Sequence, residues 1–98
     1  MRVISKKALA DFGKNHADSI KGINDWHTKT KEASWQSLSD IKKTYNSVDY
    51  VGNDRYVFNI KGNKYRLIAM ISFLKQIVWI RFVGTHSEYD TIRDCSTV

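Results

Sequence analysis

The sequence predicts an α+β fold in which N-terminal helices pack on one face of a small antiparallel β-sheet and a short helix follows at the C-terminal end. A change of pattern along the 98 residues leads to this prediction. Apolar residues in the first half recur at helical spacing, whereas from residue 55 onward they alternate as in strands with one buried side. A chain of 98 residues is expected to form a single domain, residues 1–98, around one modest core.

Three helices are expected in the first half of the chain. Ser5 is a favoured N-cap residue for the stretch KKALADFGKNH, whose apolar residues share one helical face. Asp18 precedes a second periodic stretch, SIKGINDWHTKTKEA, although Gly22 inside it lowers the helix propensity. A third, short helix is predicted in SLSDIKKTY, before a turn at Asn46-Ser47.

Three antiparallel strands are expected to follow, because RYVFNI, KYRLIAMISF and QIVWIRFV are rich in aromatic and β-branched residues. Short connections at Gly62-Asn63 and Leu74-Lys75 make them a meander. If both loops contain an even number of residues, alternate side chains of all three strands share one face. The residues expected on the core face are then Tyr56, Phe58, Ile60, Tyr65, Leu67, Ala69, Ile71, Phe73, Val78, Ile80 and Phe82.

Positive charge is concentrated in the strand region. The net charge is +6, and no acidic residue occurs between Asp54 and Glu88. Each basic side chain alone is explained by solvation of an exposed strand, but six together without a counter-charge indicate an anionic partner, with nucleic acid ahead of a membrane surface or an acidic protein. The six are Arg55, Lys61, Lys64, Arg66, Lys75 and Arg81.

Most of this charge is expected on the face opposite the core. The same alternation places Arg66 opposite Val83 and diagonal to Arg81, about 7–8 Å away. Two arginines at that separation repel unless an anion lies between them, so the pattern favours a phosphate pocket, with Trp79 offering a surface for base stacking. The alternative is that both side chains extend into solvent, where water and salt weaken the repulsion.

The segment RFVGTHSEYD, which ends the last predicted strand, carries a second set of polar residues. Thr85 and Glu88 have the spacing of a capping box, so a short helix is expected to begin there. On that helix His86 and Tyr89 lie three residues apart on adjacent parts of one surface, beside exposed N-terminal amide groups. In a purely structural interpretation, His86 is exposed without a role and Tyr89 packs onto the sheet.

These residue types suit a metal-free reaction on RNA. Cleavage by the 2′-hydroxyl requires a base, cations that stabilise the charged phosphate, and an acid for the departing 5′-oxygen. Histidine can take either proton-transfer role, and nearby arginines would favour the ionised form of Tyr89. The single cysteine, Cys95, and three scattered histidines lack the spacing of a zinc site, so no metal or cofactor is expected.

Two motifs, VFNIKGNKYRL at 57–67 and IRFVGTHSEYD at 80–90, follow a lysine-rich first half and resemble the HigB family of bacterial toxins within the RelE-like group. The resemblance implies the toxin of a type II toxin–antitoxin system, which cleaves mRNA largely on the translating ribosome and is neutralised by a HigA-type, helix-turn-helix antitoxin. By position, the resemblance implies that Arg66 and Arg81 handle phosphate and that Lys61 and Lys64 are the basic residues of the hairpin. It also implies that an acid or base lies in the last motif, which contains His86 and Tyr89.

The predicted function is therefore a metal-independent mRNA endonuclease toxin. The predicted catalytic residues are Arg66, Arg81, His86 and Tyr89, and the predicted RNA-binding residues are Arg55, Lys61, Lys64 and Trp79. The alternative is a module that binds RNA or the ribosome with the same face and cuts nothing; DNA binding is less favoured because no stretch resembles a recognition helix. The start MRVISKKALADF has no long apolar run, so a cytoplasmic protein without membrane contact is expected.

Overall fold

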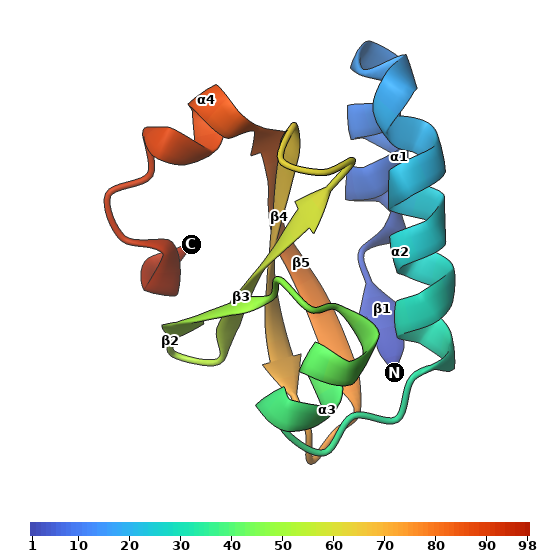
Figure 1. Cartoon of the computed structure of the whole chain (residues 1–98), viewed down its shortest axis with the longest axis vertical. Coiled ribbons are helices and arrows are strands. Elements are labelled where there is room, and N and C mark those ends of the chain that lie inside the picture. Colours follow the sequence, from blue (N-terminus) through green and yellow to red (C-terminus); the bar gives the residue numbers. More distant parts are fainter.

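In the computed structural model, which describes residues 1–98, a five-stranded β-sheet separates two N-terminal helices from the C-terminal segment (Figure 1). The strand order is β1-β5-β4-β3-β2. β1 runs parallel to β5, and the other neighbours are antiparallel. The strands are β1 (Arg2–Ile4), β2 (Asp49–Gly52), β3 (Arg55–Ile60), β4 (Tyr65–Ser72) and β5 (Ile77–Thr85).

The predicted helices are present with nearly the predicted bounds. They are α1 (Lys6–Asn15), α2 (Ile20–Glu32), α3 (Leu38–Thr44) and α4 (His86–Asp90), with single 3-10 turns at Ala17–Ser19 and Cys95–Thr97. Ser37 caps α3 by accepting a hydrogen bond from the Asp40 N–H. Ser5 has the extended backbone of an N-cap residue, but its side chain makes no capping hydrogen bond. The α+β class with helices on one face is thus confirmed.

Two edge strands extend the predicted meander. β1 has three residues and β2 has four. Runs this short show no clear alternation, and each exists because a longer neighbour supplies hydrogen bonds along its edge. β1 makes the sheet mixed, because it joins β5 in the parallel direction before the chain enters α1.

The core lies between the sheet and the N-terminal helices. Phe58 is at its centre, in contact with the rings of Trp26, Trp35 and Tyr45. All of the predicted core-face residues except Phe82 belong to this core or pack against it. The even loops that the prediction required are also present, since four residues separate β3 from β4 and four separate β4 from β5.

A β-bulge in β5 explains the exception. Ala69 pairs with Ile80, but Ile68 pairs with Phe82, so Arg81 has no partner in β4. The extra residue moves Phe82 to the face away from the helices and brings Arg66 opposite Gly84. The predictions that Phe82 lies on the core face and that Arg66 lies opposite Val83 are therefore wrong. Counting alternate residues cannot reveal a bulge, because the bulge depends on the pairing.

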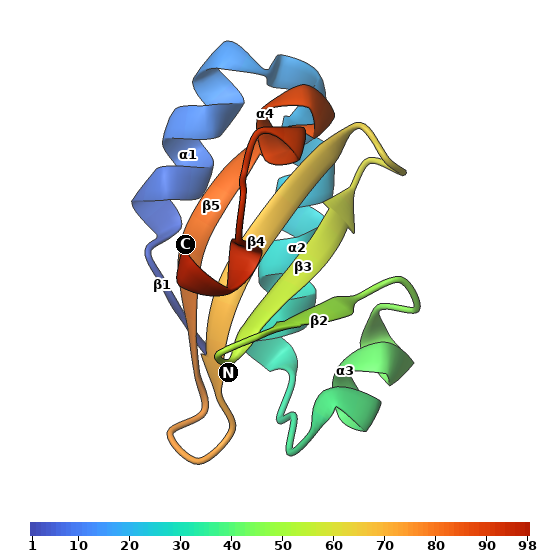
Figure 2. The same ribbon diagram turned by 90° about the vertical axis from the view of Figure 1, so that its left-hand side faces the viewer.

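The face of the sheet away from α1 and α2 is partly covered. Val57 and Ile68 lie on this face and are 3% and 0% exposed. In Figure 2 the chain after β5 crosses in front of the sheet, through α4 and the last 3-10 turn. α4 contacts β4 and β5, and the last 3-10 turn contacts β2, which places the predicted polar motif beside the sheet.

Candidate functional site

Three arginines, one from each long strand, lie on the sheet face opposite α1 and α2. They are Arg55 of β3, Arg66 of β4 and Arg81 of β5, and we call this surface the arginine face. The ion pairs of the protein are made by lysines and by His86, so none of the three arginines pairs with a side-chain carboxylate. No side-chain carboxylate therefore cancels the positive charge of this face.

Arg66 is positioned against Tyr89 of α4. Its guanidinium carbon lies 5.7 Å from the centre of the Tyr89 ring, within the range of a cation–π contact. The guanidinium also donates a hydrogen bond of 2.8 Å to the carbonyl oxygen of Asn63 in the β3–β4 turn. These contacts hold one end of Arg66 and leave it with unused donors, since a guanidinium has five N–H groups.

The Tyr89 hydroxyl is protonated at neutral pH. Burial is the largest effect that raises its pKa, followed by a hydrogen bond with Cys95, and both outweigh the opposing effect of Arg66. Arg66 does favour the ionised form of Tyr89, as predicted, but partial burial and Cys95 penalise the phenolate more, so the pKa of Tyr89 rises overall. Tyr89 is suited to donating a proton rather than to accepting one.

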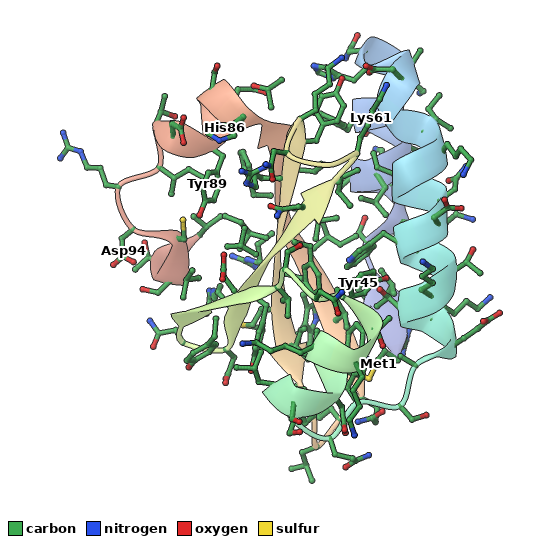
Figure 3. All side chains as sticks on the ribbon, viewed as in Figure 1. Met1, Tyr45, Lys61, His86, Tyr89 and Asp94 are labelled. Atoms are coloured by element: carbon green, nitrogen blue, oxygen red, sulfur yellow. The ribbon has the colours of Figure 1, made fainter.

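His86 is oriented by Asp90, one helical turn later. The two atoms Nδ1 of His86 and Oδ2 of Asp90 are 2.9 Å apart. When neutral His86 donates through Nδ1, its Nε2 is left as an acceptor, which is the form required of a general base. Sequence reasoning gave Asp90 no role, although the i,i+4 spacing from His86 is the signal that would have found it. Figure 3 shows His86 and Tyr89 together on α4.

The predicted capping box begins α4. The Thr85 hydroxyl accepts a hydrogen bond from the Glu88 N–H at 3.1 Å, and the Glu88 carboxylate accepts one from the Thr85 N–H at 2.8 Å. The N–H of His86 donates to the carbonyl oxygen of Lys64, 3.1 Å away. Two of the amide groups that the sequence suggested for an anion, those of His86 and Glu88, are thus already used to attach the helix to the β3–β4 turn and to cap it.

Arg55 and Arg81 converge at the other end of the arginine face. Their Nε atoms lie 3.2 and 3.1 Å from one acceptor, the main-chain oxygen of Val98. The bulge places Arg81 beside Arg55, whereas Arg66 contacts Tyr89. The expected pocket between Arg66 and Arg81 is not observed, because the surface hollows lie on the helical side of the protein. The arrangement is instead two separate arginine positions.

Trp79 belongs to the Arg55 end of this surface. It pairs with Met70 of β4, which in turn pairs with Arg55 of β3, so the three side chains form one row across the sheet. Its indole is partly exposed. A nucleobase stacked on Trp79 would bring its neighbouring phosphate close to Arg55 and Arg81.

Lys61 and Lys64 are drawn away from the arginine face. The Asp18 carboxylate accepts hydrogen bonds from both lysines, at 3.1 Å from Lys61 and at closer range from Lys64, and also from the Tyr65 hydroxyl. The expectation that most of the positive charge lies on the face opposite the core therefore does not hold for Lys61 and Lys64, which Asp18 binds. Figure 3 shows Lys61 on the helical side of the sheet. Only the tertiary fold brings Asp18, from the turn before α2, to the hairpin.

Asp18→Asn is expected to make stability less sensitive to acid. Hydrogen bonds from Lys64, Tyr65 and Lys61 hold the pKa of Asp18 well below its usual value. Such a carboxylate stabilises the fold above its unfolded pKa of about 4, and this stabilisation is lost as pH falls toward the lower folded pKa. Urea unfolding between about pH 5 and pH 2 should therefore show a steeper loss for the parent than for Asp18→Asn. Parallel curves would contradict the proposed network.

The structure has neither a metal-binding cluster nor a membrane-spanning helix. Nowhere do three His, Cys, Asp or Glu side chains lie close enough to hold an ion together. None of the helices combines the length and the apolar character needed to cross a bilayer. The side chains of the arginine face and α4 that can take part in chemistry are its arginines, Tyr89 and His86.

Comparison with known proteins agrees with this chemistry. The HigB toxin family, described as a RelE-like toxic component of a toxin-antitoxin system, matches residues 19–92. The mRNA interferase toxin HigB of Escherichia coli K12 is 32% identical over 93 residues, which cover 92% of this chain and 88% of the relative. An mRNA interferase HigB from Escherichia coli O6:H1 is 22% identical over 94 residues, covering 94% of this chain and 91% of that protein.

These matches confirm the resemblance that two short motifs indicated, and extend it over most of the sequence. The relatives' names support toxin activity by mRNA cleavage. The chain belongs to the HigB family of RelE-like toxins of toxin-antitoxin systems.

Proposed function

We propose that this chain is an mRNA endoribonuclease toxin whose catalytic surface is the arginine face together with α4. The observation that supports this most directly is the contact between Arg66 and the protonated Tyr89, on a face whose arginines have no carboxylate partners. A cation and a proton donor held together in this way match the needs of a phosphoryl group that gains charge as its leaving group departs.

The reaction uses the 2′-hydroxyl of the substrate as its nucleophile. His86 Nε2 removes the proton from this hydroxyl, and the oxygen attacks the neighbouring phosphorus. Tyr89 donates its proton to the departing 5′-oxygen as the P–O5′ bond breaks. The products are a 2′,3′-cyclic phosphate and a 5′-hydroxyl, with one proton gained by His86 and one lost by Tyr89; solvent restores both groups.

The arginines divide into a catalytic and a binding position. Arg66, next to Tyr89, stabilises the charge on the phosphate under attack. Arg55 and Arg81, which share one oxygen acceptor, bind a phosphate further along the strand, and Trp79 stacks the adjoining base. Lys61 and Lys64 contribute longer-range attraction, because Asp18 cancels part of their charge.

We further propose that the substrate is mRNA on the translating ribosome in the cytoplasm, and that the neutralising partner is a HigA-type antitoxin. The arginine face suits an RNA presented by a larger particle, since the hollows of the chain lie on its helical side and none encloses a strand at this face. The family assignment supports an antitoxin as the partner.

Mapping of mRNA 5′-ends after induction in cells tests this function. New 5′-hydroxyl ends should appear within coding regions, together with growth arrest. A reporter mRNA whose start codon is mutated should escape cleavage if translation is required. Arrest without new ends would favour the alternative, a module that binds RNA or the ribosome through the Arg55, Arg81 and Trp79 surface and cuts nothing.

A further inference from the structure

The two N-terminal helices lie on the side of the sheet opposite the arginine face (Figure 1). Between them is an apolar groove. One stripe of each helix lines it, namely Lys6, Leu9, Ala10, Gly13 and Lys14 of α1 and Ile20, Ile23, Asn24 and His27 of α2. The hollow has a volume of about 290 Å³. The stripes cover roughly two helical turns, a length of about 12 Å.

The floor of the groove is shaped to receive another helix. Gly13 allows α1 and α2 to approach closely, because a Cβ at this position would lie 3.0 Å from Cγ1 of Ile20. Ala10 is exposed beside it, so a helix backbone can come close to α1. Ile20 remains 45% exposed, one of only three large apolar side chains left so accessible. Unpartnered apolar surface on two neighbouring helices fits a third, amphipathic helix.

The rim of the groove is basic. A second hollow adjoins the groove and shares Lys6 and His27 with it. Together the residues that line the two hollows include no acidic side chain, and their cationic members are Arg2, Lys6, Lys14 and Lys31. Only Lys14 has a carboxylate within ion-pair distance, Asp11 at 3.7 Å. The positive rim selects a helix that carries acidic residues beside its apolar stripe.

We propose that this groove is the docking site for an acidic amphipathic helix of the cognate antitoxin. The proposal rests on the proposed function in one respect: the partner is an antitoxin because the chain is assigned to a toxin-antitoxin family. It concerns the side of the sheet away from the arginine face, so binding in the groove and RNA cleavage depend on different residues. RNA is disfavoured as the occupant because the floor is apolar, and a second copy is disfavoured because its groove carries the same positive charge.

The test measures the affinity of the purified cognate antitoxin for variants of the full chain by isothermal titration calorimetry. Ala10→Arg fills the groove with a bulky cationic side chain, and the dissociation constant should rise at least about 30-fold, as for the loss of an interface hot spot. Thr28→Arg is the matched control, since Thr28 is exposed on α2 outside the groove. Its dissociation constant should stay within about threefold of the parent value.

Charge reversal tests the rim separately. The double variant Lys6→Glu/Lys14→Glu should weaken antitoxin binding at least about tenfold and reduce its salt dependence. The control reversal Lys29→Glu/Lys42→Glu, at exposed positions on α2 and α3, should change the affinity far less. All four variants should retain the parent's melting temperature, because the substituted side chains are exposed. They should also retain its cleavage rate, because none lies on the arginine face.

His27 provides an independent reporter by NMR titration. Its pKa is lowered by burial and by the charges of Lys6 and Lys31. An acidic helix in the groove should raise this pKa relative to the free chain, because negative charge favours imidazolium.

Unchanged antitoxin affinity in both Ala10→Arg and Lys6→Glu/Lys14→Glu would overturn the proposal, whether or not the chain cleaves RNA. If the groove variants keep antitoxin affinity but lose self-association in sedimentation, the occupant of the groove is a second copy and the proposal is overturned. If they keep antitoxin affinity but lose RNA binding, the occupant is RNA and the proposal is likewise overturned. If the parent fails to cleave RNA but the groove variants lose antitoxin, the proposed function fails and this inference stands.

Discussion

Arg66→Ala should lower the single-turnover cleavage rate on programmed ribosomes by about 10²–10³-fold, the usual cost of removing one donor that stabilises transition-state charge. Arg66 is the arginine held against Tyr89, 5.7 Å from its ring. Its loss should affect the rate more than the affinity for RNA, because Arg55 and Arg81 remain at the binding end of the face. In cells, the variant should no longer arrest growth.

Two controls separate this role from charge and from folding. Arg66→Lys keeps the charge but loses the planar group, so it should recover part of the affinity and little of the rate. Arg81→Ala removes a phosphate contact at the other end, so it should weaken RNA binding and reduce the salt dependence of that binding, with a smaller effect on the rate. A folded Arg66→Ala protein that cleaves at the parent rate would remove Arg66 from the catalytic site.

Tyr89→Phe should slow cleavage by about 10²–10⁴-fold while leaving RNA affinity nearly unchanged, as expected for loss of a general acid. The phenyl ring retains the packing and the contact with Arg66, so only the proton is lost. His86→Gln should produce a loss in the same range, because glutamine cannot take the 2′-hydroxyl proton. Asp90→Asn should have a smaller effect, since it only removes the carboxylate that orients His86.

The pH profile distinguishes the two residues. Tyr89 must be protonated to act as an acid, so the rate of the parent should fall at high pH, above the ordinary pKa of tyrosine, because burial and Cys95 raise the pKa of Tyr89. Tyr89→Phe should abolish this fall at high pH, whereas His86→Gln should retain it, because only the first removes the proton donor. If both Tyr89→Phe and His86→Gln cleave within about threefold of the parent, neither is a proton-transfer group.

Local pattern determined which segments form helices and long strands and which strand residues face the core. Alternation along β3 and β4 is a property of the backbone, and the loops kept the predicted parity, so Tyr56, Phe58 and Leu67 lie where expected. The capping box at Thr85 also needed only residues close in sequence. The two motifs were also enough to indicate the family, which the comparisons extend over most of the chain.

The tertiary structure decided how those residues are grouped. The bulge at Arg81 depends on the fit between β4 and β5. Arg81 shares the Val98 oxygen with Arg55 and does not lie in a common pocket with Arg66. Asp18 reaches Lys61 and Lys64 only when α1 and α2 pack on the sheet. The pKa of Tyr89 likewise depends on its burial, which the C-terminal segment creates by folding back. Charges and hydroxyl groups act through distance and solvent exposure, and both are set by contacts between segments far apart in the sequence.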